Sequence, residues 1–418
     1  MDLKLEMLIK RKCKAEEDNR RIGLDRLPTD IALDIFLRLP VISVIQSTFV
    51  CRYWRSLLLD QHLATLHLSR AVNRNPMLFF HSDYPIRNEL CFAELPASDD
   101  NDDEKGIVKK ISTPFSASMP EFTVEGSCNG LLCLSDTLYK DALYIYNPLT
   151  RDYKELPKTR QYEEETVVYG FGYHPGTKEY KVVKIVHHWI VNFDDQYVRR
   201  RPISGTSKSE VLVLTLGRNA WRNVGLAPYH LERRSHEAVF TNGRLHWLYF
   251  GFYENVRGLI IISFDLAEEK FYEVPRPNLI PIDGRNYHLA ILNGCLSAVV
   301  YGHGLRRDLE IWVMKEYNVK ESWIKEFKFR SYVPAESPCR KLPRPVRTLR
   351  NNFRHQTLRV LCTLENGGIL IEYNTGRLVV YDPENGKYKE IVFEGMPGMF
   401  QTVVHTGSLN RIDLPIQM

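Results

Sequence analysis

The feature that most constrains the fold is a unit that recurs along the chain from about residue 76 onward. Each copy contains an apolar strand, a polar turn, and an aromatic residue on the returning strand. Three of these aromatic residues, Trp221, Phe271 and Trp323, are 50 and 52 residues apart. A period near 50 residues is typical of the four-stranded blades of a kelch-like β-propeller. The copies span residues 143–153, 211–221, 260–271, 311–323 and 378–388.

A second kind of hairpin accompanies these copies. Asn-Gly pairs flanked by apolar residues occur at 129–130, 242–243, 293–294 and 366–367. Both residue types tolerate the positive φ of a tight hairpin turn, so each pair predicts a β-hairpin. Two hairpins supply the four strands of a blade, and we expect residues 77–95 and 402–409 to make or close a further blade. A large all-β propeller is therefore predicted for residues 76–412, with an open meander or a sandwich as the alternative.

Residues 22–70 predict helices instead, so the fold class is α+β and multidomain. Pro28 suits the first turn of a helix, and Ile31 and Ile35 lie one turn apart on one face. Leu39 extends this face, and Pro40 ends the helix. A second helix is expected from Ser43, with Val50, Trp54, Leu57 and Leu58 on one stripe, and a third over residues 61–69. A unit this small can bury only part of its apolar surface, which predicts an exposed partner-binding face.

Bulk properties are those of a folded intracellular protein. Of the 418 residues, 44% are hydrophobic and 26% are charged. No apolar run approaches the ~20 residues of a membrane-spanning helix, and the N-terminus lacks a signal-peptide core. The eight cysteines form no CxxC pair, and no Asn-x-Ser/Thr glycosylation site occurs, which favours a reducing compartment. We therefore expect a cytoplasmic and/or nuclear protein, with residues 1–21 as a flexible charged tail.

Charge is distributed unevenly along the chain, whose net charge is only +5. Residues 99–104 are acidic, whereas the proline-punctuated stretch 340–354 is basic. Both can be solvated loops between strands. The functional alternatives for the basic stretch are that it helps to hold an acidic target, or that it binds nucleic acid.

The residues that could carry catalysis fit known sites poorly. Gly126-x-Cys128-x-Gly130 matches a nucleophile elbow, but a strand follows where the elbow needs a helix. His187-His188 and His236-Glu237 lack a spaced third metal ligand, and Gly170-Phe171-Gly172 lacks the third glycine of a dinucleotide site. We therefore predict no catalytic residues, no metal and no cofactor. A stand-alone propeller binding protein or enzyme, whose helical N-terminus is incidental, remains an alternative.

Several motifs resemble those of a known family. The ordered set Leu27-Pro28-x-Asp30-Ile31, Ile35, Arg38-Leu39-Pro40 and Val50-Cys51-x-x-Trp54-x-x-Leu57-Leu58 resembles the F-box. Downstream, the segments 126–131, 146–150 and 170–175 with 180–183 resemble the F-box-associated domain of the large plant F-box family. The resemblance covers nearly the whole chain, although His174 stands where the family often has Asp.

The resemblance implies a non-catalytic, substrate-recognition subunit of an SCF-type ubiquitin ligase. In this family the F-box, here residues 22–70, packs on a Skp-type adaptor that leads to cullin and RING subunits. The β domain, here residues 76–412, then holds a protein substrate for ubiquitination and degradation. The residues carried over to the adaptor interface are Leu27, Pro28, Ile31, Ile35, Leu39, Pro40, Val50 and Trp54. For the unidentified substrate, the candidate segments are 187–209 and 331–356, the second of which includes Arg344, Arg347 and Arg350.

Overall fold

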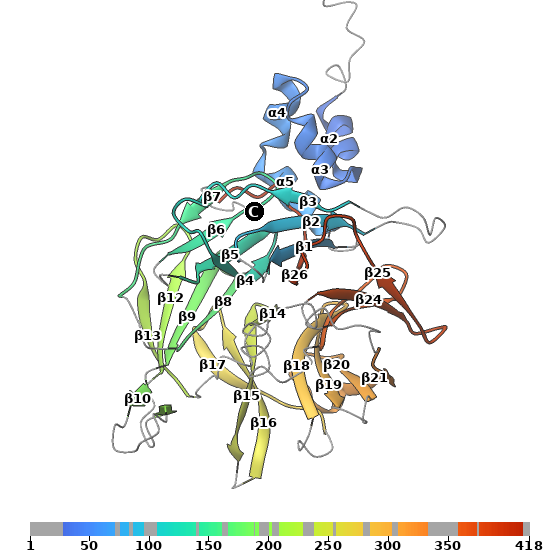
Figure 1. Ribbon diagram of the computed structural model, residues 1–418. Helices are drawn as coiled ribbons and strands as arrows, with labels where there is room; N and C mark the ends of the chain where they lie inside the picture. Colours follow the sequence, from blue (N-terminus) through green and yellow to red (C-terminus); the bar gives the residue numbers. More distant parts are fainter. Residues whose placement is uncertain are drawn as a thin grey trace, which may run out of the picture.

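The computed structural model describes residues 28–71, 76–82, 87–95, 107–138, 142–160, 166–187, 189–191, 200–202, 209–228, 238–253, 256–278, 285–302, 308–332, 358–373 and 376–412. It contains a helical unit at the N-terminal side and a ring of β-sheets (Figure 1). The helices are α2 (Thr29–Arg38), α3 (Val41–Ser47), α4 (Arg52–Leu58) and α5 (Gln61–Ala71).

The prolines begin and end the first helices as their chemistry requires. Pro28 is the N-cap of α2, and Leu39 is extended because it precedes Pro40, which caps α3. The single second helix expected from Ser43 is wrong, because the chain forms α3 and α4 with a break between them. Cys51 is extended (φ −152°) and its Sγ accepts the backbone N–H of Trp54, so it caps α4. The stripe of apolar residues crosses this break, which is why its spacing resembled one helix.

Among the described residues, strands form six four-stranded antiparallel sheets, which are the blades of a propeller. Blade 1 contains β26 (Phe400–His405), β1 (Met77–Ser82), β2 (Leu90–Glu94) and β3 (Lys109–Ile111). Blade 2 contains β4 (Phe122–Cys128), β5 (Leu131–Asp136), β6 (Leu143–Tyr146) and β7 (Tyr153–Glu155). Blade 3 contains β8 (Thr166–His174), β9 (Glu179–His187), β12 (Ser209–Thr215) and β13 (Arg222–Ala227).

The remaining blades repeat this order. Blade 4 contains β14 (Val239–Thr241), β15 (Arg244–Tyr253), β16 (Val256–Asp265) and β17 (Lys270–Val274). Blade 5 contains β18 (Arg285–Leu292), β19 (Cys295–Gly302), β20 (Asp308–Met314) and β21 (Trp323–Arg330), with a short 3₁₀ turn at Lys320–Ser322. Blade 6 contains β22 (Leu358–Thr363), β23 (Ile369–Tyr373), β24 (Arg377–Asp382) and β25 (Lys387–Ile391). A separate hairpin, β10 (Trp189–Val191) with β11 (Arg200–Pro202), leaves blade 3 between β9 and β12.

The ring is closed by the two ends of the β domain. The last strand, β26, pairs with β1 from Met77↔His405 to Ser82↔Phe400. The expected contribution of segments 77–95 and 402–409 to a further blade is thus confirmed. The innermost strands β26, β4, β8, β14, β18 and β22 each contact the next around the ring.

In blades 3, 5 and 6 the repeated aromatic residue donates a hydrogen bond to the preceding blade. The indole Nε1 of Trp221 donates to Pro157 O at 2.6 Å, and that of Trp323 donates to Pro275 O at 2.7 Å. Tyr388 donates its hydroxyl to Arg330 O in the same position of blade 6. These three residues lie at or near the outer strands of their blades, so this part of the repeat reflects a recurring contact between blades. The apolar cores also lie between blades, for example between blades 3 and 4 around Trp247.

The propeller has two different faces. Connections between the first and second strands, and between the third and fourth, lie on one face, which we call the turn face. Asn129 and Gly130, with φ of 50° and 82°, make such a connection, and so do Asn242-Gly243 and Asn293-Gly294. In the corresponding turn of blade 6 only Gly367 has a positive φ. The opposite face, here the loop face, carries the connections from second to third strand and from blade to blade.

The helical unit sits on the turn face. Val41 and Ile42 of α3 pack against the core of blades 1 and 2, and Leu409, which follows β26, is buried in the core of the helical unit. In Figure 1 the helices lie at one end of the molecule, while the β10 and β15–β16 hairpins extend at the other. The two units are therefore packed together.

Several histidines with little exposure join neighbouring blades, among them His405 and His288. His405 Nδ1 and Ser127 Oγ form a 3.0 Å hydrogen bond between blades 1 and 2. His288 Nε2 accepts the N–H of Val360 at 2.9 Å between blades 5 and 6. Burial lowers the pKa of each to about 3, and the positive charge of Arg359 adds to the effect at His288. Both are neutral at pH 7.

We predict that acid weakens the ring through these histidines. Below the ordinary histidine pKa of about 6.5, these histidines bind protons in the unfolded chain but not in the folded chain. The free energy of unfolding therefore falls as the pH falls. Each histidine contributes a slope of about 1.4 kcal/mol per pH unit, which continues until the pH reaches the folded pKa. Urea denaturation between pH 7.5 and 5 will measure it. His405→Gln should remove one such slope, and equal slopes in the wild type and this variant would contradict the prediction.

Candidate protein-interaction site

The helical unit has a closed core. Ala32, Phe36, Leu37, Val44, Leu58, Leu63 and Ala64 are buried there together with Leu409. Phe36 and Trp54 meet edge to face, with ring centroids 5.1 Å apart. The unit therefore needs no further apolar side chain to complete its interior.

Large apolar side chains nevertheless remain outside this core. Ile31 and Ile35 on α2 are 46% and 37% exposed, and Phe49 and Val50, between α3 and α4, are 85% and 65% exposed. Thr29 Oγ1 and Tyr53 OH are hydrogen bonded at 3.1 Å, which holds the start of α4 beside the start of α2. We call Pro28, Ile31, Ile35, Phe49 and Val50 the exposed apolar face. Apolar surface gathered in this way is typical of a protein-binding site.

The residues predicted for the adaptor interface divide into two groups. Pro28, Ile31, Ile35 and Val50 lie on the exposed apolar face, and Pro40 is exposed at the start of α3. Leu39 and Trp54 instead pack, partly buried, against the core of the helical unit. Leu27 lies outside the described residues. Phe49 was missed because it falls off the apolar stripe, and helical spacing gives no other signal for it.

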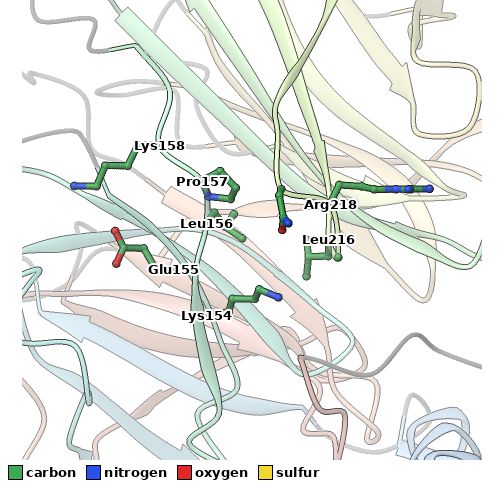
Figure 2. A pocket seen from close by; sticks show the side chains of 9 residues that line it. Lys154, Glu155, Leu156, Pro157, Lys158, Leu216 and Arg218 are labelled. Carbon is green, nitrogen blue, oxygen red and sulfur yellow. The ribbon is translucent and has the colours of Figure 1, made fainter.

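The β domain has a shallow hollow at the outer edge of blades 2 and 3. Its volume is about 420 Å³, and it lies between the chain that leaves β7 and the β12–β13 turn (Figure 2). Leu156, Pro157 and Leu216 give it an apolar floor, and Lys154, Glu155, Lys158, Gly217, Arg218 and Asn219 surround it. Glu155 accepts the hydroxyl of Tyr144. The hollow therefore combines an apolar floor with a charged and polar rim.

The sequence motifs weighed for catalysis have structural roles. Cys128 is 5% exposed in the β4–β5 hairpin, and burial raises the pKa of its thiol to about 12. This strand-turn-strand setting differs from a nucleophile elbow. Gly170 and Gly172 lie in β8, where a Cβ would come within 2.7 Å of Leu245 and 2.5 Å of Phe240. These glycines therefore allow blade 4 to pack closely.

Of the histidines weighed for metal binding, His187 alone lies in the part of the chain that the structure describes. His187 Nδ1 and Ser209 Oγ are hydrogen bonded at 2.6 Å in blade 3. His188, His236 and Glu237 lie outside the described residues. In the part of the chain that the structure describes, no three His, Cys, Asp or Glu side chains are grouped to hold a metal ion. No helix within the same ranges is long and apolar enough to cross a membrane.

Comparison with known proteins matches both units. Residues 24–65 match the F-box-like family, and residues 76–408 match the F-box associated beta propeller domain family. The F-box protein At3g07870 of Arabidopsis thaliana is 45% identical over 405 residues, which cover 95% of this chain and 94% of that protein. The chain is an F-box protein. Its helical unit is the F-box and its six-bladed ring is the F-box-associated propeller.

More distant F-box relatives also match most of the chain. The Arabidopsis thaliana F-box protein CPR1 is 26% identical over 92% of this chain and 88% of its own. The F-box/kelch-repeat protein At3g23880 of the same plant is 27% identical over 72% of this chain and 78% of its own. Among solved structures, an oligogalacturonate lyase in complex with manganese aligns over 76% of this chain and 78% of its own. Its TM-score of 0.38 and identity of 11% carry no inference about activity.

We predict that the exposed apolar face of the F-box contributes little to stability. Ile31→Ser should change the free energy of unfolding by no more than about 0.5 kcal/mol, because the side chain already meets water. Phe36→Ala, which empties part of the core, should cost about 3–5 kcal/mol. Urea titration followed by far-UV circular dichroism will compare them. A loss in Ile31→Ser as large as that in Phe36→Ala would place Ile31 in the core instead.

Proposed function

We propose that this F-box protein is the non-catalytic, substrate-recognition subunit of an SCF-type ubiquitin ligase. The observation that carries the proposal is the exposed apolar face on an F-box whose own core is already filled. A Skp-type adaptor that covers Ile31, Ile35, Phe49 and Val50 would remove this surface from water. Buried apolar anchors of this kind dominate the energy of many protein interfaces.

The two faces of the propeller support a division of labour. The F-box occupies the turn face, so the loop face is left open to a second protein. The segments nominated for substrate binding begin and end there: 187–209 connects β9 to β12, and 331–356 connects β21 to β22. Residues 333–357 themselves, with Arg344, Arg347 and Arg350, lie outside the described residues. In this proposal the substrate is held on the side away from the adaptor.

Such a subunit acts by bringing its substrate close to the conjugating enzyme. Holding a target lysine near a conjugating enzyme raises the effective concentration of the reacting groups. No residue of this chain then needs to touch the transferred ubiquitin, and no cofactor is required. The proposed action places the protein where cullin-based ligases act, in the cytoplasm and/or the nucleus.

The adaptor proposal predicts that the wild-type chain and a Skp-type adaptor co-elute in size-exclusion chromatography. Ile31→Asp combined with Val50→Asp should weaken this binding by about 100-fold or more, because each charge would be desolvated in the interface. The matched control is Val392→Asp, a 56% exposed apolar position on the propeller, which should bind normally. If the folded wild-type chain does not bind the adaptor, the hypothesis of a stand-alone binding protein or enzyme is favoured.

The substrate proposal predicts charge-dependent capture at the loop face. Changing Arg344, Arg347 and Arg350 to Glu should remove proteins that proximity biotinylation detects with the wild type, while adaptor co-elution stays unchanged. The control changes Asp99, Asp100 and Asp102 to Asn, because β2 and β3, which flank that segment, are joined at the turn face. Unchanged labelling in the arginine variant would reject this segment. Loss of bound nucleic acid instead, with a steep dependence on salt, would favour the nucleic-acid alternative.

A further inference from the structure

The segment that follows the ring-closing strand lies between the F-box and the propeller. Residues 406–412 leave β26 on the turn face, and residues 407–410 are buried. Leu409, 7% exposed, packs with Ala32, Phe36 and the other core residues of the F-box. A residue near the C-terminal end of the chain thus completes the interior of a unit formed by residues 29–71.

The polar groups of the same segment are held by blades 2 and 3. Ser408 Oγ and Asn410 Nδ2 both donate to Asn129 O, at 2.8 and 3.0 Å. Asn147, fully buried, donates from Nδ2 to Ser408 O at 3.2 Å and to Asn410 O at 2.8 Å. The segment is therefore fixed by side-chain hydrogen bonds as well as by packing.

The fit on both sides leaves no room for larger side chains. A Cβ on Gly407 would lie 2.8 Å from Val41 Cγ1 of α3 and 2.9 Å from Leu149 Cδ1 of blade 2. A Cβ on Gly130 would lie 2.0 Å from Ser408 Oγ. At Gly407 the F-box, the segment and the propeller are thus in close contact.

We propose that residues 406–412 act as a clamp that completes the F-box core and seats the F-box on the closed ring. The clamp is continuous with β26, so its position depends on the pairing of β26 with β1. The F-box is then fully ordered only when the propeller is closed. For adaptor binding this inference rests on the proposed function, because a loosened F-box would present the exposed apolar face less often. The ordering of the F-box itself does not depend on any partner.

Hydrogen exchange of the full-length protein without adaptor tests the clamp. Leu409→Ala should speed amide exchange in α2 and α5 by about tenfold or more, because it leaves a cavity in the F-box core, while β14 to β21 keep their protection. Gly407→Val should do the same in α3 by forcing Val41 away. The matched control is Leu296→Ala, which removes a buried leucine of blade 5 and should speed exchange there and not in the F-box.

The possible results separate the clamp from the ligase proposal. Unchanged exchange in the F-box of both clamp variants would overturn the clamp, and so would an equal increase across all blades. Acceleration of α2 by Leu296→Ala to the same extent would overturn it as well. Adaptor binding is then measured on the same proteins, and Leu409→Ala should weaken it several-fold relative to Leu296→Ala. A wild-type chain that binds no adaptor would reject the proposed function while the exchange result still decides the clamp.

Discussion

The pairing of β26 with β1 is the constraint on which the rest of the structure depends. Each blade of a propeller packs against a neighbour on each side. Blade 1 is complete, and the ring closed, only once β26 has paired with β1. Here that strand is tied on both sides. Thr402 of β26 receives a hydrogen bond from Arg359 and donates its N–H to Glu372 of blade 6, and His405 bonds Ser127 of blade 2. Closure thus joins three blades, and it also brings the segment that contacts the F-box to its place.

The repeated parts of the fold could be predicted because their causes are local. An Asn-Gly pair favours a tight hairpin through its own backbone preferences, and three of the four pairs adopt positive φ at both residues. The aromatic residues Trp221, Trp323 and Tyr388 recur because each reaches a carbonyl of the preceding blade. Blade 1 gave a weaker signal, since its inner strand comes from the far end of the chain and no local pattern records that pairing.

The interaction site was predictable only in part. The α2 face with Ile31 and Ile35 follows from helical spacing, but the position of Val50 and Phe49 depends on where α3 ends. The start of α4, which follows them, is set by the extended backbone of Cys51, whose Sγ accepts the N–H of Trp54. Periodicity does not encode this cap. Trp54 and Leu39 are as apolar as the exposed residues, and only tertiary packing shows that they face inward. The contact of Leu409 with the F-box spans most of the chain, so it could come only from the structure.

The order of the strands also has a consequence for how the protein is made. β1 begins with Met77-Leu78-Phe79-Phe80, which is fully buried in the finished ring, and one of its edges pairs only with β26. During synthesis that apolar edge has no partner until β26 has left the ribosome. An unpaired apolar strand edge is a template for pairing with other chains. The nascent protein is therefore exposed to aggregation from the synthesis of β1 until β26 has been made, and its yield depends on how quickly β26 follows.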